Sequence, residues 1–211
     1  ESKGVVGMNL KDISTSVPRK DHKGKVSGQL PYISDVKVQN MVYGVLYRSP
    51  IAYGKIISIQ LPNLPEGYEA VGAEHIPGPN FVKIIKEDQP VFANEWVNYI
   101  GEPILMLVGK DLNILYGLLD EVKIEFEEHP PIYTLEEAIK QKAAPGVTMA
   151  HYEFGESLEV ISAIEQGAHQ IIEEEYETGY QEHVYLEPQG MLAIYKDDEI
   201  VVQGSMQCLY Y

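Results

Sequence analysis

The sequence predicts an α+β fold built from two successive parts. Several short runs are rich in β-branched and aromatic residues, two segments repeat their apolar residues at helical spacing, and a Pro-Gly break falls at residues 142–146. Apolar residues make up 45% of the 211 residues and charged residues 23%, as in globular proteins, which argues against a disordered or collagen-like chain. We therefore expect strands and helices packed around a core.

The first part is predicted to begin with an extended arm. Residues 1–32 are polar and show little periodicity, and order is expected after Pro31. Strands are then predicted at 41–47 and 54–59, with the Ser-Pro pair at 49–50 as the break between them. A short strand at 70–73 and a turn at 76–80 follow.

The next segment is predicted to form the centre of the fold. Strands are expected at 91–93, 96–100 and 103–109, and the last is apolar enough to be buried on both faces. Asp111 is placed to cap a helix over 112–119. The alternating run 122–126 is predicted as a strand, which completes a compact strand, helix, strand unit.

The second part is predicted to begin near the break at 142–146, after a short helix at 135–139. A helix is expected from Ser157 to Gln166, with Gly167 as its stop. Strands are predicted at 170–176, 190–195 and 199–203, and the last two should pair as a hairpin around the turn at 196–198.

The distribution of charge excludes some partners. The formal net charge is -16, yet residues 1–60 hold nine Lys and Arg against four Asp and Glu, so the rest of the chain is strongly acidic. Nucleic-acid binding is not expected because an acidic surface repels phosphates. The basic stretch 19–25 is interpreted as a solvated arm or as a contact with an acidic partner subunit.

Cysteine content and hydropathy indicate a cytoplasmic protein. Cys208 is the single cysteine, which excludes an intrachain disulfide and a multi-thiolate zinc site. No apolar run approaches the roughly 20 residues of a membrane span, and no signal peptide opens the chain, so no membrane partner is expected.

Common enzyme motifs are missing from the sequence. It contains no Walker-type phosphate loop, no Gly-x-Gly-x-x-Gly and no His-Glu-x-x-His. The six histidines are scattered, and we expect them on the surface or in packing roles. The acidic run 173–177 and the pair Glu127-Glu128 are interpreted as solvated strand residues rather than as a metal site or an acid and base pair.

Two C-terminal stretches have a less ordinary composition. Residues 180–190 combine amides, an imidazole and carboxylates in a segment predicted to be half buried, which favours an ordered hydrogen-bond network. Residues 203–208 follow a Val-rich strand and place the primary amide of Gln207 near a strand end, where loops often build sites. From the residues alone, both a functional role and a packing role for Gln207 stay open.

Ordered motifs along nearly the whole chain resemble those of the molybdenum hydroxylase family, which includes xanthine dehydrogenases and aldehyde oxidases. Gln181-Glu182-His183 with Glu187, followed by a strand that ends in Ser-x-Gln, resembles the family's molybdopterin-binding domain. Upstream, the chain is similar to the family's N-terminal segment and α/β-hammerhead domain at 16–21, 25–28, 46–52, 89–93, 97–103 and 125–138. The stretch 203–208 further resembles a bacterial, purine-oxidising branch thought to be selenium-dependent, although Leu209 stands where Pro is common.

The resemblance implies a division into an extended arm at 1–20, an α/β-hammerhead domain at 21–145 and the N-terminal portion of a molybdopterin-binding domain at 146–211. It implies an enzyme that hydroxylates a purine, another N-heterocycle or an aldehyde with oxygen derived from water. The cofactor would be molybdopterin with Mo, in the cytosine dinucleotide or another form, with a sulfido or selenido ligand. FAD and 2Fe-2S clusters would lie on partner subunits or domains.

By position, Gln207 matches the glutamine whose amide hydrogen-bonds the apical oxo ligand of molybdenum, and it is the one site residue carried over. The family's glycine-rich cofactor loop, substrate-binding Arg and base Glu would lie beyond position 211, so we expect this chain to be inactive by itself and to bind no cofactor. The rival hypothesis is a non-catalytic α/β interaction module that docks a redox partner. Continuation of the reading frame into a glycine-rich loop and a late Glu would favour the enzyme.

Overall fold

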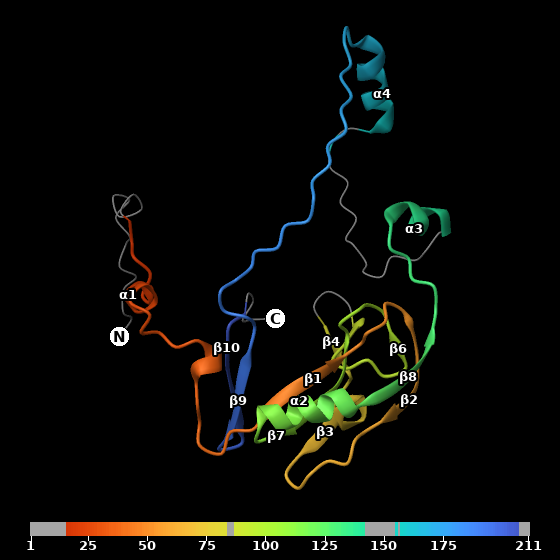
Figure 1. The fold of residues 1–211 in the computed structure, drawn as a ribbon. Helices are drawn as coiled ribbons and strands as arrows, with labels where there is room; N and C mark the ends of the chain where they lie inside the picture. Colours follow the sequence, from red (N-terminus) through yellow and green to blue (C-terminus); the bar gives the residue numbers. More distant parts are fainter. Residues whose placement is uncertain (1–15, 84–86, 142–154, 156, 207–211) are drawn as a thin grey trace. The chain divides into compact units, whose positions relative to one another are not determined.

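The computed structural model describes residues 16–83, 87–141, 155 and 157–206. Its elements, labelled as in Figure 1, are α1 (His22–Val26), η2 (Ile33–Asp35), β1 (Tyr43–Arg48), β2 (Gly54–Gln60), β3 (Glu69–Gly72), η3 (Ala73–His75), β4 (Phe81–Val82), β5 (Gln89–Pro90), β6 (Trp96–Val97), β7 (Pro103–Gly109), α2 (Leu112–Glu121), β8 (Lys123–Glu128), α3 (Leu135–Gln141), α4 (Leu158–Gly167), β9 (Met191–Lys196) and β10 (Glu199–Gly204).

The chain forms two units. One comprises Glu1–Val38 together with Tyr180–Tyr211, and the other is Gln39–Gly179. The two ends of the sequence therefore belong to one unit, while the intervening residues form the other. The predicted break at 142–146 lies outside the described residues, and the division at residue 145 stays a prediction.

The first sheet of the Gln39–Gly179 unit has the order β1-β7-β3, with both pairs antiparallel (Figure 1). The prediction that 103–109 is the central strand is confirmed. Leu105 and Leu107 of β7 are buried in a cluster with Val45, while Ile104, on the opposite face, is buried in a second cluster. A strand with apolar side chains on both faces is stable only where packing covers both faces.

Helix α2 packs on the first sheet and follows its predicted course. The Asp111 carboxylate accepts hydrogen bonds from Asn113 N at 2.8 Å and Ile114 N at 3.2 Å, which caps the helix as predicted. Leu115 and Leu118 lie one turn apart and are buried against β1 and β7. The helix thus covers the apolar face of the sheet.

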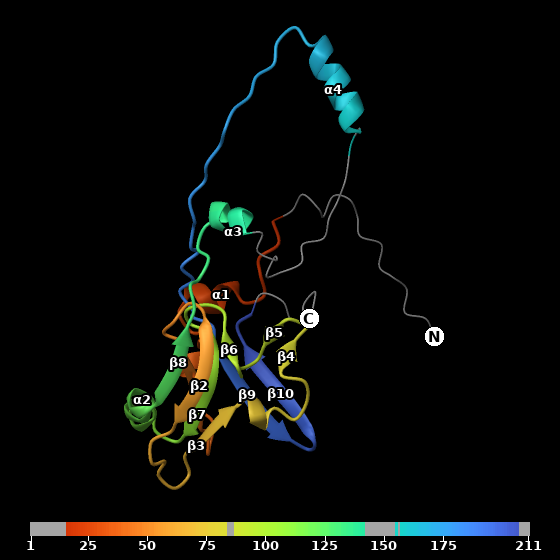
Figure 2. The same cartoon turned by 90° about the vertical axis from the view of Figure 1, so that its right-hand side faces the viewer.

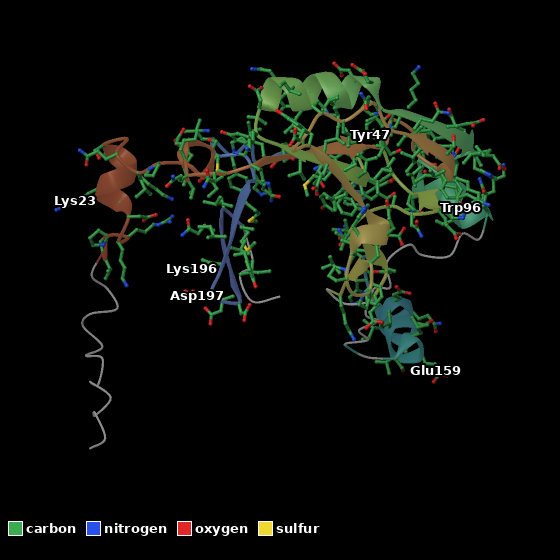
Figure 3. All side chains as sticks on the ribbon, turned by 90° about the horizontal axis from the view of Figure 1, so that it is seen from below. Lys23, Tyr47, Trp96, Glu159, Lys196 and Asp197 are labelled. Atoms are coloured by element: carbon green, nitrogen blue, oxygen red, sulfur yellow. The ribbon has the colours of Figure 1, made fainter. Side chains whose placement is uncertain are left out.

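The second sheet has the order β6-β2-β8, also antiparallel (Figure 2). Val97 of β6 is fully buried with Ala93 and Ile104. Tyr47, labelled in Figure 3, packs against this cluster and against the first one. Since β7 and β8 lie in different sheets, the predicted strand, helix, strand unit at 103–126 crosses from one sheet to the other.

Two of the loop motifs noted in the sequence bind each other. Ser49, buried in the turn after β1, donates its backbone N–H to Glu102 O at 2.8 Å, and its carbonyl oxygen accepts from Gly101 N at 2.8 Å. The Arg48 guanidinium donates to Gly101 O at 2.8 Å. The buried Glu102 carboxylate accepts from Asn98 N. These contacts join the turn after β1 to the segment that precedes β7.

The prediction of a strand at 91–93 is wrong. The structure has β5 at Gln89–Pro90, and Val91–Ala93 form no strand. Asn80 uses its side-chain amide in place of a strand partner: its Nδ2 donates to Phe92 O at 2.7 Å, and its Oδ1 accepts from Phe92 N at 3.1 Å. The strand predicted at 96–100 is shortened to β6, because Asn98 N turns toward the Glu102 carboxylate.

Two predictions of extended structure outside the sheets need correction. Helix α1 lies within the predicted arm 1–32, where Asp21 pairs with Lys25 one helical turn later at 3.1 Å and with Arg19 at 3.0 Å. Residues 170–176 pair with no described strand and therefore form none themselves. They are exposed. Helices α3 and α4 agree with their predictions, and Ser157 caps α4 by accepting from Val160 N at 3.4 Å.

Candidate functional site

The β9–β10 hairpin belongs to the unit formed by the two ends of the sequence. The predicted pairing of the two runs as a hairpin is confirmed, and the antiparallel register runs from Lys196 opposite Glu199 to Met191 opposite Gly204. Asp197 and Asp198 form its two-residue turn with φ of 54° and 62°, as a type I′ turn requires. Lys196 and Asp197 lie at the turn in Figure 3, so the opposite, open end is where the chain continues to Ser205 and Met206.

Gln207, the site residue predicted from the resemblance, lies outside the described residues. The described chain ends at Met206, two residues after β10. A primary amide at 207 therefore follows the end of a paired strand by three residues. The placement of this amide and its role both stay predictions.

The open end of the hairpin is crowded. A β-carbon on Gly204 would lie 2.7 Å from Gly190 O and would overlap the Met191 sulfur. Only glycine lets the two backbones approach this closely here. The direction in which the chain leaves β10 is therefore constrained by close contact with the start of β9.

A cavity of about 640 Å³ lies within the same unit. Its volume is in the range of small-molecule sites in proteins. Its lining includes Ser205 and Met206 from the end of the hairpin. The remaining lining comes from both ends of the sequence, namely Arg19, Lys25, Gly28, Leu30, Pro31, Tyr32, Asp35, Tyr185, Leu186, Glu187 and Gln189.

The cations that line this cavity are paired with a carboxylate. The Arg19 guanidinium forms two hydrogen bonds of 3.0 Å to Asp21, and the Lys25 ammonium lies 3.1 Å from the same side chain. The hydrogen bond from Lys25, followed by those from Arg19, lowers the pKa of Asp21 below its usual value of 3.8. Two cations thus share this one anion, while the carboxylates of Asp35 and Glu187 in the lining accept hydrogen bonds from backbone N–H groups.

Four of the lining side chains carry hydrogen-bond donors, namely Arg19, Lys25, Gln189 and Ser205. Arg19 and Lys25 already pair with Asp21, and the carboxylates of Asp35 and Glu187 lie in the same lining. Within the described ranges, no group of three His, Cys, Asp or Glu side chains gathers as a metal site. The sequence did not single out Arg19 and Lys25 as lining residues, because they lie over 150 residues from the hairpin.

The polar stretch 180–190 differs from its prediction. Residues 180–186 are exposed, so the expectation that the segment is half buried is wrong for most of its length. Among the described residues, the Glu182 carboxylate accepts hydrogen bonds from the adjacent amides His183 N and Val184 N, and the His183 ring stacks on Tyr185. Polar groups that water can reach need no protein partner, so density of polar residues alone did not predict burial. Glu187 and Gly190 are the exceptions, since both are half buried.

The histidines and acidic residues considered as site candidates either make local structural contacts or are exposed. The His75 ring accepts from Gly72 N at 3.0 Å, and His129 lies 3.1 Å from Glu127 beside Tyr53 and Trp96. Glu127 and Glu128 end strand β8, as predicted for the polar end of a strand. Residues 173–177 are exposed. Across the part of the chain that the structure describes, no helix is long and apolar enough to cross a membrane.

Two family models match the chain. Residues 27–130 match the a/b hammerhead domain of aldehyde oxidase and xanthine dehydrogenase, and residues 139–211 match a molybdopterin cofactor-binding domain. A probable xanthine dehydrogenase subunit of Bacillus subtilis is 30% identical over 186 residues, which cover 85% of this chain and 25% of the relative. The nicotinate dehydrogenase large molybdopterin subunit of Eubacterium barkeri is 26% identical, over 92% of this chain and 47% of the relative.

A solved structure extends the match to the fold. Quinoline 2-oxidoreductase of Pseudomonas putida 86 superposes with a TM-score of 0.55 and 26% identity, over 66% of this chain and 19% of that protein. The fold is thus an α/β-hammerhead domain followed by molybdopterin-binding sequence. The chain belongs to the molybdenum hydroxylase family of xanthine dehydrogenases and aldehyde oxidases. It spans between a quarter and about half the length of the two curated relatives named above.

Proposed function

We propose that the protein containing this chain is a cytoplasmic molybdenum hydroxylase whose substrate is an aromatic N-heterocycle. The observation that supports this substrate class is the kind of compound after which the relatives are named. Xanthine, nicotinate and quinoline, after which three similar proteins are named, are all aromatic rings with ring nitrogen. Ring nitrogen withdraws electrons from the adjacent carbon, which makes that carbon the position for attack by oxygen.

The proposed cofactor is molybdopterin with Mo, and electrons would pass to 2Fe-2S clusters and FAD on partner subunits or domains. When bound, the cofactor supplies the oxygen transfer and accepts the electron pair, while the protein supplies binding and orientation. In this chain, the proposed contribution is the Gln207 amide, which would donate a hydrogen bond to an oxygen ligand of the metal. Such an indirect contact orients a metal centre without ligating it.

The substrate class is tested on the complete enzyme with its redox subunits. Xanthine, nicotinate, quinoline and an aromatic aldehyde are each supplied with an artificial electron acceptor in ¹⁸O-labelled water. We expect turnover of at least one N-heterocycle with the label in the product. Turnover of the aldehyde alone would reject the proposed substrate class. Nucleotide released by acid hydrolysis of the same preparation identifies the form of the pterin cofactor.

The role of Gln207 is tested by Gln207→Ala in the complete enzyme. We expect turnover to fall by about tenfold or more, with molybdenum content and the unfolding midpoint close to those of the unchanged enzyme. Gln203→Ala is the matched control, because Gln203 is an exposed amide of strand β10, four residues earlier in the chain. Unchanged turnover in Gln207→Ala would reject the assigned role.

A further inference from the structure

A second cavity, of about 190 Å³, lies within the Gln39–Gly179 unit. It is smaller than the roughly 300 Å³ at which small-molecule sites begin, yet several times larger than the about 30 Å³ that one water molecule occupies. The space therefore suits one side chain of a partner better than a separate small-molecule ligand.

The floor of this cavity belongs to the hydrophobic core. Ala93, Ile104 and Leu105 line it, and all three are buried. Ile104 belongs to one core cluster and Leu105 to the other. The cavity thus lies where the two clusters meet.

One wall of the cavity is an apolar surface that the core leaves open. Ile59 lies opposite Ile124, which packs against both clusters, and residues directly opposite in an antiparallel pair share a face of the sheet. Ile59 nevertheless is 42% exposed, and Leu61, in the same wall, is 46% exposed. Covering these side chains with an apolar group would be favourable.

The rim of the cavity is acidic. Segments 56–82 and 92–109 supply the whole lining, and they contain five glutamates but no Lys or Arg. Glu74 lines the cavity and is exposed. His75 directs its Nδ1 toward Gly72 N, from which it accepts at 3.0 Å, so this nitrogen carries no proton to share with Glu74. The negative charge of Glu74 therefore faces solvent.

These features define the chemistry of a partner. An apolar centre with a polar rim is typical of protein–protein contacts, whose anchoring side chains fill such pockets. A second copy of this chain would bring its own net charge of -16 and would be repelled. A partner that presents an aliphatic side chain beside a Lys or Arg fits both the core-lined floor and the acidic rim.

We propose that this cavity anchors a redox subunit of the complete enzyme, which inserts one aliphatic side chain into it and places a neighbouring Lys or Arg against Glu74. The proposal rests on the proposed function, in which partner subunits accept the electrons. It gives the hammerhead domain a part in holding the enzyme together.

The apolar contact is tested by calorimetric titration of the molybdenum subunit with its separately purified redox subunits. Ile59→Ser makes the wall polar, and the Kd should rise about tenfold. Ile57→Ser is the matched control: Ile57 also lies in β2, is 50% exposed and is not a lining residue, so the Kd should stay within about twofold. Ala73→Leu fills the cavity from within and should raise the Kd about tenfold without lowering the unfolding midpoint.

The charge at the rim is tested by Glu74→Gln. The Kd should rise about threefold at low salt, and the difference should disappear at high salt, because salt screens exposed charges. Glu66→Gln is the matched control, since it removes an exposed carboxylate outside the lining, and it should change the Kd less. Equal effects of the two variants would contradict the assigned contact with Glu74.

Photo-crosslinking in the complete enzyme identifies the occupant. Leu61→p-benzoylphenylalanine places a photoreactive group in the wall of the cavity. We expect a cross-link to a redox subunit, which mass spectrometry should locate at an aliphatic residue close to a Lys or Arg. Ile57→p-benzoylphenylalanine, outside the lining, should give little of this product.

Equal Kd values for Ile59→Ser and Ile57→Ser, or an unchanged Kd for Ala73→Leu, would overturn the proposal. A cross-link from position 61 to the same polypeptide, or to a second copy of it, would overturn it too, because the cavity would then have another occupant. These measurements need no turnover, so they still decide the proposal if the substrate class is wrong. A complete enzyme without redox subunits would reject the proposed function and this proposal together, whereas redox subunits that bind all variants equally would reject this proposal alone.

Discussion

The ring of Tyr68 lies directly over the backbone of Gly109, so closely that a β-carbon on that glycine would overlap the ring atoms Cδ1 and Cε1. The hydroxyl of the same tyrosine accepts a hydrogen bond from Asp111 N at 3.2 Å. Tyr68 thereby spans the junction between β7 and α2. It ties the central strand to the N-terminus of the helix that covers the sheet.

Gly109→Ala should destabilise the protein by about 2 kcal/mol, because the added methyl group displaces Tyr68 and weakens its hydrogen bond to Asp111. Urea unfolding followed by the fluorescence of Trp96, the single tryptophan, measures the change. Gly117→Ala is the matched control: Gly117 lies in α2 with nothing near its β-carbon position, and alanine should stabilise the helix by about 0.8 kcal/mol. A loss of stability in both variants would contradict the assigned contact.

Leu115→Ala should lower the free energy of unfolding by about 3 kcal/mol, since Leu115 is fully buried between α2 and the first sheet and its truncation leaves a cavity. Ile114→Ala changes the adjacent residue of the same helix, which is 46% exposed, and should cost less than about 0.5 kcal/mol. Denaturant midpoints of the two variants compare them directly. Similar losses would show that α2 does not bury the face described.

The pKa of Asp21 should rise toward its usual value in Lys25→Ala, because the hydrogen bond from Lys25 is the main cause of its low value. A group whose pKa is lowered by folding stabilises the fold above its unfolded pKa. That contribution is lost as the pH falls through the folded pKa, so the pairs around α1 should weaken only below pH 3.8.

NMR titration of the Asp21 side chain, with the α1 amide shifts as a second probe, measures this pKa. Lys23→Ala removes a neighbouring cation and keeps both pairs to Asp21, so it should leave the titration nearly unchanged. A similar rise in both variants would mean that general charge, rather than the Lys25 contact, sets the pKa.

Local patterns predicted the elements that depend on local chemistry. The apolar run 103–109 is the central strand, the 112–119 helix begins at an Asp111 cap, and the two runs around 196–198 pair as a hairpin. In each case the signal is the spacing of apolar residues or a capping or turn residue within a few positions. The molybdenum hydroxylase family was likewise identified from the order of short motifs.

The sequence by itself thus determined the main strands, the helix caps and the family, because these follow from residues close together in the chain. Only the tertiary structure decided that Asn80 replaces a strand partner for Phe92, that β7 and β8 lie in different sheets, and that Ile33 binds Glu187. The physical reason is that in each case a backbone group finds its hydrogen-bond partner in a part of the chain that is distant in sequence. Such a partner leaves no periodicity or cap near the group that it satisfies.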